Sequence, residues 1–425
     1  MQFLAIGWAA IIAIVVTSVR HWVDIWTSMP QLTEPGNLPP TPFNGSRTVF
    51  SNSTIRQTLR MTLSADQIRI RVTNVFGLTD LLVTAMTVAL PANGSAGVAA
   101  VQPQTVMPLT FSGSQSIVIP NGALAVSDPI DFLVHSGSMI SVSMYLSDGQ
   151  QGFAITSHPG SRTTSWLTSG NTINDANMTS TGLASVAHWY YLSAVEAWLP
   201  NTSRAFAIVG DSITDGRGSE TDKNNRWPDL LLARMQKQPS TSPIAVLNQA
   251  AGGNRVLADG LGPNAQGRID RDVLSHSGVR YAMLFEGVND IGSAAATTAA
   301  QNAVYSRLLL AYQQLATRIH AFSIPLFAAT ITPFSAPNST IQPYSDPLRE
   351  ATRSKVNEWI RTSGVFDRVV DFDAVLRDPR NSTMLDPQYD SGDYLHPNVR
   401  GYQALADAFP LELFDRFSEG VSSFI

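Results

Sequence analysis

The chain contains no cysteine among its 425 residues. This absence excludes disulfide bonds, thiolate metal sites and a cysteine nucleophile. Charged residues make up only 14% of the sequence and hydrophobic residues 44%, which is typical of a well-packed globular protein and not of a disordered one. Without disulfides the fold must rely on its cores, and a chain of this length is long enough to form two domains.

Positive charge is also scarce. Lys and Arg number 28 against 33 Asp and Glu, the formal net charge is −5, and no basic run occurs. Because a nucleic-acid-binding protein carries a basic face, this balance argues against nucleic acid as a partner. The histidines lack the His-X-His and His-Glu-X-X-His spacings of metal ligands, so we expect no metal site.

The apolar run at residues 3–16 is shorter than the roughly 20 residues that a membrane-spanning helix needs. We interpret residues 1–18 as a secretory signal peptide that is cleaved near Ser18. No Lys or Arg precedes the run, so a membrane anchor retained at the N-terminus stays the alternative.

Glycosylation sequons also indicate secretion. Seven Asn-X-Ser/Thr triplets occur, more than casual expectation, and they predict a glycosylated, extracellular protein of eukaryotic type. The triplets begin at Asn44, Asn52, Asn93, Asn177, Asn201, Asn338 and Asn381.

Residues 45–200 are rich in Thr, Val, Ser and Ile and alternate between apolar and polar positions. This period of two predicts an antiparallel β-sandwich domain. Within it we interpret residues 55–63 and 67–75 as a hairpin with Ala65 and Asp66 at its tip. Residues 19–44, with a Pro-rich stretch at 34–42, are interpreted as an N-terminal segment and linker.

In residues 201–425, short apolar runs alternate with segments of helical periodicity. This alternation predicts an α/β domain with a parallel sheet flanked by helices. The expected strands are 204–209, 244–247, 281–285 and 324–330, and the expected helices are 228–236, 300–322 and 350–361.

A serine lies directly after the first of these strands, in Gly210-Asp211-Ser212-Ile213-Thr214. A serine hydroxyl is a poor nucleophile until a neighbouring base takes its proton. Asp393 and His396, three positions apart near the C-terminus, offer such a base and an acid that orients it, as acyl transfer through serine requires. The structural alternatives are a simple Gly-Asp-Ser turn and an Asp393 that caps the helix expected at 398–409.

Acyl transfer also needs hydrogen-bond donors for the developing oxyanion. Gly252-Gly253-Asn254 and Gly287-Val288-Asn289-Asp290 follow two further expected strands. Because the carboxyl ends of parallel strands meet at one edge of a sheet, we expect these segments to lie near Ser212.

These segments resemble the blocks of the SGNH (or GDSL) hydrolases, a family of lipases and acylesterases. The matching residues are 210–216 for the nucleophile block, 248–255 for the glycine block, 287–290 for the Gly-X-Asn-Asp block and 393–397 for the last block. The resemblance implies a three-layer, flavodoxin-like fold. It implies Ser212 as nucleophile, His396 as base and Asp393 as its orienting acid. It also implies an oxyanion hole made of the Ser212 N–H, the Gly253 N–H and Asn289 Nδ2.

Residues 21–26, 69–77 and 224–229 are similar to segments of a secreted branch of this family that carries an N-terminal β-domain. Gly252 and Gly253 are adjacent, so either amide is a candidate for the hole, and the offset from Asn248 favours Gly253. Separately, we expect the carboxylates of Asp211, Asp215 and Asp290 to brace turns by accepting hydrogen bonds from backbone N–H groups.

The resemblance implies a secreted serine esterase that needs no cofactor and forms an acyl-enzyme on Ser212. Its expected partners are short-chain or carbohydrate-linked carboxylic esters, with no nucleic acid and no metal. An acyltransferase would use the same residues and differ in excluding water. A polysaccharide-binding protein with an inert hydrolase domain is the alternative from another class.

Overall fold

The computed structural model describes residues 19–179 and 182–421. The predicted signal peptide, or retained anchor, lies outside the described residues. Within the described ranges, none of the helices combines the length and the apolar character needed to cross a membrane.

The N-terminal half is an antiparallel β-sandwich, as predicted. Its first sheet has the order β1 (Arg20–Thr27), β18 (Leu192–Pro200), β5 (Ala65–Thr73) and β10 (Leu124–Val126), with β11 (Ile130–Val134) also paired to β5. Its second sheet has the order β16 (Ala184–Val186), β15 (Ser165–Ser169), β4 (Ser53–Arg60), β12 (Met139–Leu146), β7 (Ala85–Ala89) and β8 (Met107–Leu109). Shorter strands are β2 (Gln31–Leu32), β3 (Thr48–Val49), β6 (Leu81–Val83), β9 (Ile117–Ile119), β13 (Gln150–Gln151), β14 (Thr156–His158) and β17 (Trp189–Tyr190).

The predicted hairpin between residues 55–63 and 67–75 is wrong. Strand β4 pairs with β12 and β15, whereas β5 pairs with β18, β10 and β11, so the two strands belong to opposite sheets. Ala65 and Asp66 lie inside β5. The connection carries Met61 and Leu63, which are both buried. A tight hairpin would keep the two strands side by side in one sheet, whereas residues 61–64 cross between the sheets and bury these apolar side chains.

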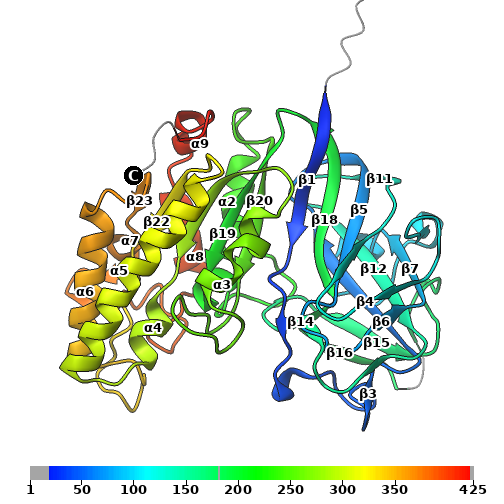
Figure 1. Ribbon diagram of the computed structural model, residues 1–425, viewed down its shortest axis with the longest axis horizontal. Helices are drawn as coiled ribbons and strands as arrows, with labels where there is room; N and C mark the ends of the chain where they lie inside the picture. Colours follow the sequence, from blue (N-terminus) through cyan, green and yellow to red (C-terminus); the bar gives the residue numbers. More distant parts are fainter. Residues whose placement is uncertain (1–18, 180–181, 422–425) are drawn as a thin grey trace, which may run out of the picture.

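Residues 20–27, in the N-terminal segment, are a strand of the sandwich. They form β1, which pairs with β18 from Arg20 opposite Pro200 to Thr27 opposite Ala194. Val23 and Ile25 are fully buried, so the strand contributes to the core. Figure 1 shows β1 and β18 between the rest of the sandwich and β20 of the second domain. Across this boundary, the Asp24 N–H donates to the Ser277 carbonyl at 2.9 Å.

The C-terminal half contains the predicted parallel sheet. Its order is β20 (Ile244–Ala250), β19 (Arg204–Gly210), β21 (Val279–Phe285), β22 (Leu326–Ala329) and β23 (Arg368–Val370). This 2-1-3-4-5 order is that of flavodoxin-like folds, in which ligands bind beyond the carboxyl ends of the strands near the first strand. The proposed domain boundary at residue 200/201 falls between β18 and β19.

Helices cover both faces of this sheet and complete three layers (Figure 1). One group contains α3 (Ala265–Ile269), α4 (Val288–Ser293), α5 (Thr298–His320) and α6 (Pro347–Thr362). The other contains α2 (Trp227–Met235), α7 (Phe372–Leu376) and α8 (Val399–Ala408). From β19 the chain crosses first to β20 on one side, and then returns past β19 to β21, β22 and β23 on the other side. Because these crossovers are right-handed, the two groups of helices lie on opposite faces of the sheet. The remaining elements are α1 (Ser212–Asp215), the π-helical turn η4 (Asp270–Leu274), α9 (Glu412–Arg416) and the strand pair β24 (Arg377–Asp378) and β25 (Asn381–Leu385).

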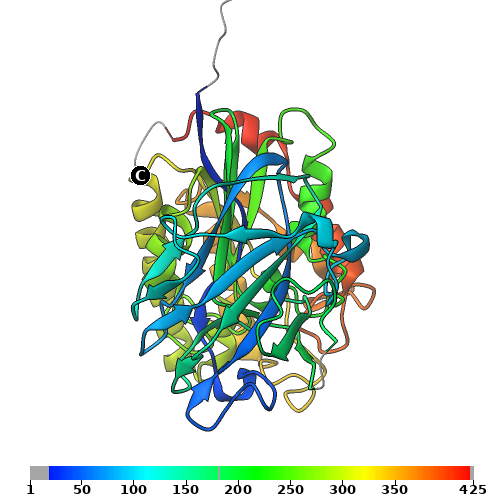
Figure 2. The ribbon, with the colours of Figure 1, turned by 90° about the vertical axis from the view of Figure 1, so that its right-hand side faces the viewer.

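Local sequence explains where the main helices begin. Thr297 caps α5 by accepting from the Ala300 N–H, and Asn398 caps α8 by accepting from the Gly401 N–H at 3.0 Å. The apolar stripe of α5, which includes Leu308 and Leu315, is buried against the sheet. Figure 2 looks onto the sandwich, which lies in front of this second domain, so the two halves of the chain stand face to face.

Candidate active site

Ser212 is the first residue of α1, directly beyond the carboxyl end of β19. Asp211 caps this short helix, because its Oδ1 accepts from the Ile213 N–H at 2.9 Å. Gly210 is needed for the sharp turn, since a Cβ there would lie 2.5 Å from the Thr214 side chain. Trp227 Nε1 donates to Thr214 Oγ1 at 3.2 Å from the first turn of α2, and this bond fixes the turn that presents the serine.

The structure brings His396 and Asp393 to this serine. Ser212 Oγ lies 2.8 Å from His396 Nε2, and His396 Nδ1 lies 2.6 Å from Asp393 Oδ2. The other oxygen, Oδ1 of Asp393, accepts from the backbone N–H groups of Leu395 and His396 at 3.1 and 2.8 Å. Tyr394 between them has a positive φ of 61°, which curls the backbone so that one carboxylate reaches both the ring and the amides.

The charge of Asp393 suits the role of orienting acid. Burial acts to raise the pKa of Asp393, but the hydrogen bond and charge of His396 and the two backbone N–H bonds outweigh it and hold that pKa below its ordinary value. An ionised Asp393 accepts from Nδ1, which leaves Nε2 of His396 free to take a proton from Ser212. Ser212 and His396 are both buried, at 6% and 5% exposure.

Three hydrogen-bond donors, one of them the backbone N–H of Ser212, border the cleft. Among the residues that the structure describes, the backbone N–H groups of Ser212 and Gly253 have no acceptor. Asn289 Nδ2 donates one hydrogen to the Asn254 carbonyl at 2.8 Å, and its second hydrogen stays available. Tyr344 Oη lies 3.0 Å from Asn289 Oδ1 and holds the other end of the amide.

The two adjacent glycines differ in their contacts. The Gly252 N–H donates to Asp215 Oδ2 at 3.0 Å and is therefore engaged. Gly253 has a φ of +73°, a conformation that glycine adopts without strain. A side chain at this position would also meet Leu261 at 2.5 Å. These contacts favour the Gly253 amide over that of Gly252 as an oxyanion donor.

The three neighbouring aspartates brace backbone turns, as predicted. Besides the contacts of Asp211 and Asp215, Asp290 accepts from the N–H groups of Val256 and Leu257, both at 2.9 Å. These two amides follow the glycine loop, so Asp290 ties the Gly-X-Asn-Asp segment after β21 to the loop after β20.

A group of buried acids lies beneath the nucleophile. Burial, opposed by the Ile213 N–H and reinforced by Asp290 and Asp215, raises the pKa of Asp211 to about 7. Burial also raises the pKa of Glu286 and that of Asp290 above their ordinary values.

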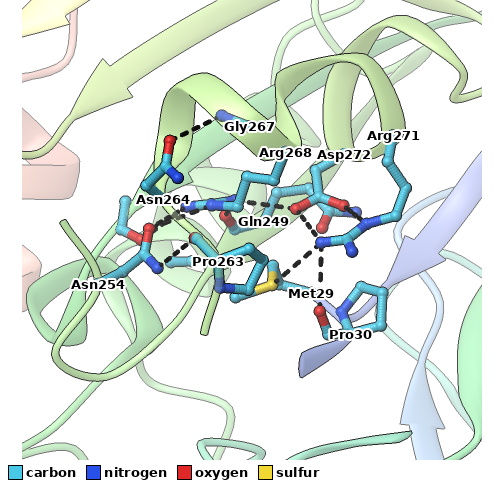
Figure 3. A network of polar contacts seen from close by, with 12 residues as sticks. Met29, Pro30, Gln249, Asn254, Pro263, Asn264, Gly267, Arg268, Arg271 and Asp272 are labelled. Carbon is cyan, nitrogen blue, oxygen red and sulfur yellow. Dashed lines mark hydrogen bonds and ion pairs between the residues drawn. The ribbon is translucent and has the colours of Figure 1, made fainter. Parts of the chain in front are cut away.

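Arg268, on α3, is the buried cation of this region (Figure 3). Its guanidinium donates to the Gln249 carbonyl at 2.6 Å, to Asn254 Oδ1 at 3.0 Å and to Glu286 Oε1 at 3.1 Å. Asn254 directly follows Gly253, so Arg268 fixes the glycine loop from within the domain. The guanidinium also pairs with Asp272 at 3.2 Å.

The cleft has a volume of about 620 Å³ and is lined by both domains. The C-terminal domain contributes Ser212, Gly253, Asn289 and His396. The N-terminal half contributes Gln31, Glu34, Asn37, Pro159, Gly160 and Arg162. Part of the Pro-rich stretch interpreted as a linker therefore forms a wall of the cleft. Sequence reasoning missed these residues, because no motif marks them and only the folded chain brings them to Ser212.

The histidines do not converge on a metal site. Within residues 19–179 and 182–421, no cluster of three His, Asp or Glu residues is arranged to hold a metal ion.

Comparison with known families agrees with the geometry. Residues 208–404 match the model of the GDSL-like lipase/acylhydrolase family. This match identifies a GDSL-like lipase/acylhydrolase domain at residues 208–404. All four blocks named from the sequence lie within the matched residues. No curated protein matches the chain.

Solved structures with similarity to the chain include a catalytic mutant of an acetylxylan esterase from Geobacillus stearothermophilus. It is 18% identical, with a TM-score of 0.36, and the match covers 48% of this chain and 92% of that one. A GDSL-like lipase from Bacteroides thetaiotaomicron is 14% identical, with a TM-score of 0.34, and the match covers 48% of this chain and 85% of that one.

Proposed function

We propose that this protein is a secreted serine esterase that hydrolyses carboxylic esters through an acyl-enzyme on Ser212. The observation that carries the proposal is the continuous chain from Ser212 Oγ to His396 and Asp393, with bonds of 2.8 and 2.6 Å, at the floor of a cleft. No other reaction class uses this arrangement so directly.

Each step has a group in position. His396 Nε2 takes the proton from Ser212 Oγ as the oxygen attacks the ester carbonyl, and Asp393 stabilises the imidazolium. The N–H groups of Ser212 and Gly253 and the Asn289 amide donate to the oxyanion. His396 then gives its proton to the leaving alkoxide and activates the water that releases the acid.

Hydrolysis is favoured over transfer to another alcohol because water reaches the site. The Asp393 side chain is 36% exposed, and the cleft above Ser212 is open. A transferase would need to exclude water while the acyl-enzyme waits for its acceptor. Product analysis with an added alcohol or sugar acceptor separates the two: free acid as the main product supports the proposal, and a dominant transfer product contradicts it.

The cleft lining favours a polar, carbohydrate-linked or short-chain ester. Gln31, Glu34, Asn37, Arg162 and Arg217 offer hydrogen-bonding groups suited to sugar hydroxyls. Two exposed apolar side chains border the cleft, Leu261 and Ile341. They can accommodate a short acyl group but do not form the broad apolar patch that a lipid surface requires.

The direct test is Ser212→Ala. We expect a loss of ester turnover of about 10⁴-fold or more with an unchanged unfolding midpoint. A fluorophosphonate should label the native protein at Ser212 and leave the variant unlabelled. Turnover by the variant at the native rate on a p-nitrophenyl acetate panel, or no labelling of the folded native protein, contradicts the proposal.

Secretion rests on the apolar N-terminal run and the sequons. Six of the seven sequon asparagines are exposed and Asn44 is half-buried, so each offers an accessible acceptor. Expression in a eukaryotic secretory host should give a protein in the medium whose mass falls on treatment with an N-glycosidase, and whose N-terminus lies near residue 19. Retention in the membrane fraction favours the anchor instead.

A further inference from the structure

We propose that the β-sandwich is a working part of the active site: its residue His158 acts through Asp215, which holds the Gly252 N–H, to position the neighbouring Gly253 amide of the oxyanion hole. The inference rests on the proposed esterase function and goes beyond it, since it gives a catalytic purpose to the second domain. His158 is here a positioning residue, because it acts through another side chain.

The contact runs from one domain to the other. His158 is the last residue of β14 and only 3% exposed. Its Nε2 lies 3.0 Å from Oδ1 of Asp215, which ends the helix that Ser212 begins. The other oxygen of Asp215 accepts from the Gly252 N–H at 3.0 Å. One carboxylate thus joins the sandwich to the peptide that precedes Gly253.

Both ring nitrogens of His158 face acceptors. Nδ1 lies 3.0 Å from the Met29 carbonyl oxygen, which can only accept, and Nε2 faces the carboxylate of Asp215. Asp215 is buried, and its carboxyl group is held by the ring of His158 and by the Gly252 N–H. Removing the ring contact leaves a buried polar group with one partner fewer, which is costly.

The surroundings fit this contact closely. The Trp189 ring stacks on the His158 ring, with centroids 5.7 Å apart and planes at 23°, which fixes the direction of Nε2. Gly160, two residues along, leaves room for the carboxylate, because a Cβ there would lie 1.8 Å from Asp215 Oδ2. The loop after β14 therefore packs closely against Asp215 from the side of the sandwich.

A second chain of contacts reaches the other end of the glycine loop (Figure 3). Arg271 donates to the Pro30 carbonyl of the N-terminal domain at 3.2 Å and to Asp272 Oδ2 at 2.9 Å. Asp272 Oδ2 accepts from Arg268, which holds Asn254 Oδ1. The three-residue loop around Gly253 is thus held on both sides, and on both sides the contacts lead to the sandwich.

The catalytic consequence follows from what an oxyanion hole does. Its donors must point at the charge that develops in the transition state, and loss of one donor costs about 10²- to 10³-fold in kcat. A loop released at Gly252 would present the Gly253 amide less well. The loss should fall on kcat and spare KM, because the bond to the oxyanion forms only in the transition state.

Two substitutions at the same position test the contact. Glutamine places its amide near the position of Nε2 and keeps a donor for Asp215, whereas asparagine places it near Nδ1 and loses that donor. We expect His158→Asn to lower kcat on p-nitrophenyl acetate about 10- to 100-fold with KM within about twofold, and His158→Gln to restore most of it. Inhibition by a boronic acid, which mimics the tetrahedral oxyanion, should weaken by a similar factor in His158→Asn.

His276→Gln is the matched control. His276 is the other buried histidine between the domains: its Nδ1 lies 2.7 Å from Asp24 Oδ2 and its Nε2 lies 2.8 Å from Gln249 Nε2, away from Asp215 and Gly252. Glutamine places its amide near Nε2 and loses the donor to Asp24, so we expect His276→Gln to lower the unfolding midpoint while kcat stays within about threefold. Equal kcat values in the asparagine and glutamine variants of His158, or an equal kcat loss in His276→Gln, would mean that His158 only holds the domains together and would overturn the proposal.

Gly160→Ala provides an independent approach if His158→Asn does not fold. The added methyl group displaces Asp215 from the sandwich side without removing a charge, and kcat should again fall more than KM rises. An unchanged kcat contradicts the proposal. If the native protein hydrolyses esters through Ser212 but these substitutions leave kcat unchanged, this inference alone is refuted. If the native protein has no esterase activity, the proposed function is refuted.

Discussion

The two walls of the cleft are built in different ways. One wall comes from the GDSL domain, where Ser212, Gly253 and Asn289 each follow a strand of the parallel sheet and His396 precedes a helix. The opposite wall comes from the sandwich, where Glu34 and the residues after β14 lie in irregular segments. Reactive groups thus sit in short motifs on a regular frame, and the groups that shape and support the site come from loops without a motif.

The largest effect should come from removing the proposed general base, His396, in the wall that the GDSL domain forms. We expect His396→Gln to lower kcat/KM on short esters by about 10⁴-fold, because it removes the base that we propose for Ser212. Steady-state kinetics measure this loss. His135→Gln, at an exposed histidine of the sandwich, is the control and should keep native activity. A fall of less than tenfold in His396→Gln would assign the base elsewhere.

A smaller effect is expected at the oxyanion. Asn289→Ala removes a donor while the triad stays intact, so kcat should fall about 10²- to 10³-fold with little change in KM. Tyr344→Phe removes only the bond to Asn289 Oδ1 and should cost less. If Asn289→Ala raised KM and left kcat unchanged, the side chain would bind substrate instead of stabilising the transition state.

The wall from the sandwich should affect substrate choice more than chemistry. Glu34 borders the cleft and accepts from Gln31 Nε2 at 2.7 Å and Asn37 Nδ2 at 3.0 Å. For Glu34→Ala we expect KM to rise about 3- to 10-fold on an acetylated oligosaccharide, the worth of one or two hydrogen bonds, and to stay unchanged on p-nitrophenyl acetate. Equal changes on both substrates would contradict a role for this wall in sugar recognition.

The smallest effect concerns the acids under the nucleophile. Asp211, with a pKa raised to about 7, keeps its proton in the folded chain between about pH 4 and 7, where the unfolded chain has lost it. Folding therefore takes up a proton in this interval, and this contribution to stability declines as pH rises through it.

Asp211→Asn should flatten that decline, because asparagine keeps an acceptor for the Ile213 N–H and cannot ionise. Urea unfolding of both proteins at pH 5 and pH 8 measures the difference. An identical pH dependence in the variant would show that Asp211 titrates in the same range folded and unfolded.

Sequence reasoning recovered much of the GDSL domain, because parallel strands buried on both faces read as apolar runs and the blocks mark their ends. It failed where contacts join distant segments. The crossing from β4 to β5 was mistaken for a hairpin because Ala65 and Asp66 look like a turn, although Met61 and Leu63 require burial. Strand β23, with three residues, was too short to show a period.

The candidate site divides in the same manner. The proposed triad and oxyanion donors could be named from spacing and resemblance, since they lie in the four blocks. His158 could not, because it lies 57 positions from Asp215 and stands in no pattern with it. Its importance depends on how β14 approaches α1, which is a property of domain packing and not of any segment alone.

The position of β1 has a consequence for anyone who wishes to shorten this protein. Strand β20 is an edge of the parallel sheet: among the described strands it pairs only with β19, and its flank is covered by β1 from the other half of the chain. A fragment cut at the domain boundary would expose an apolar edge that can recruit further strands and aggregate. Strand β1 therefore also covers the edge of a sheet that begins almost two hundred residues later. The two halves are best expressed as one piece.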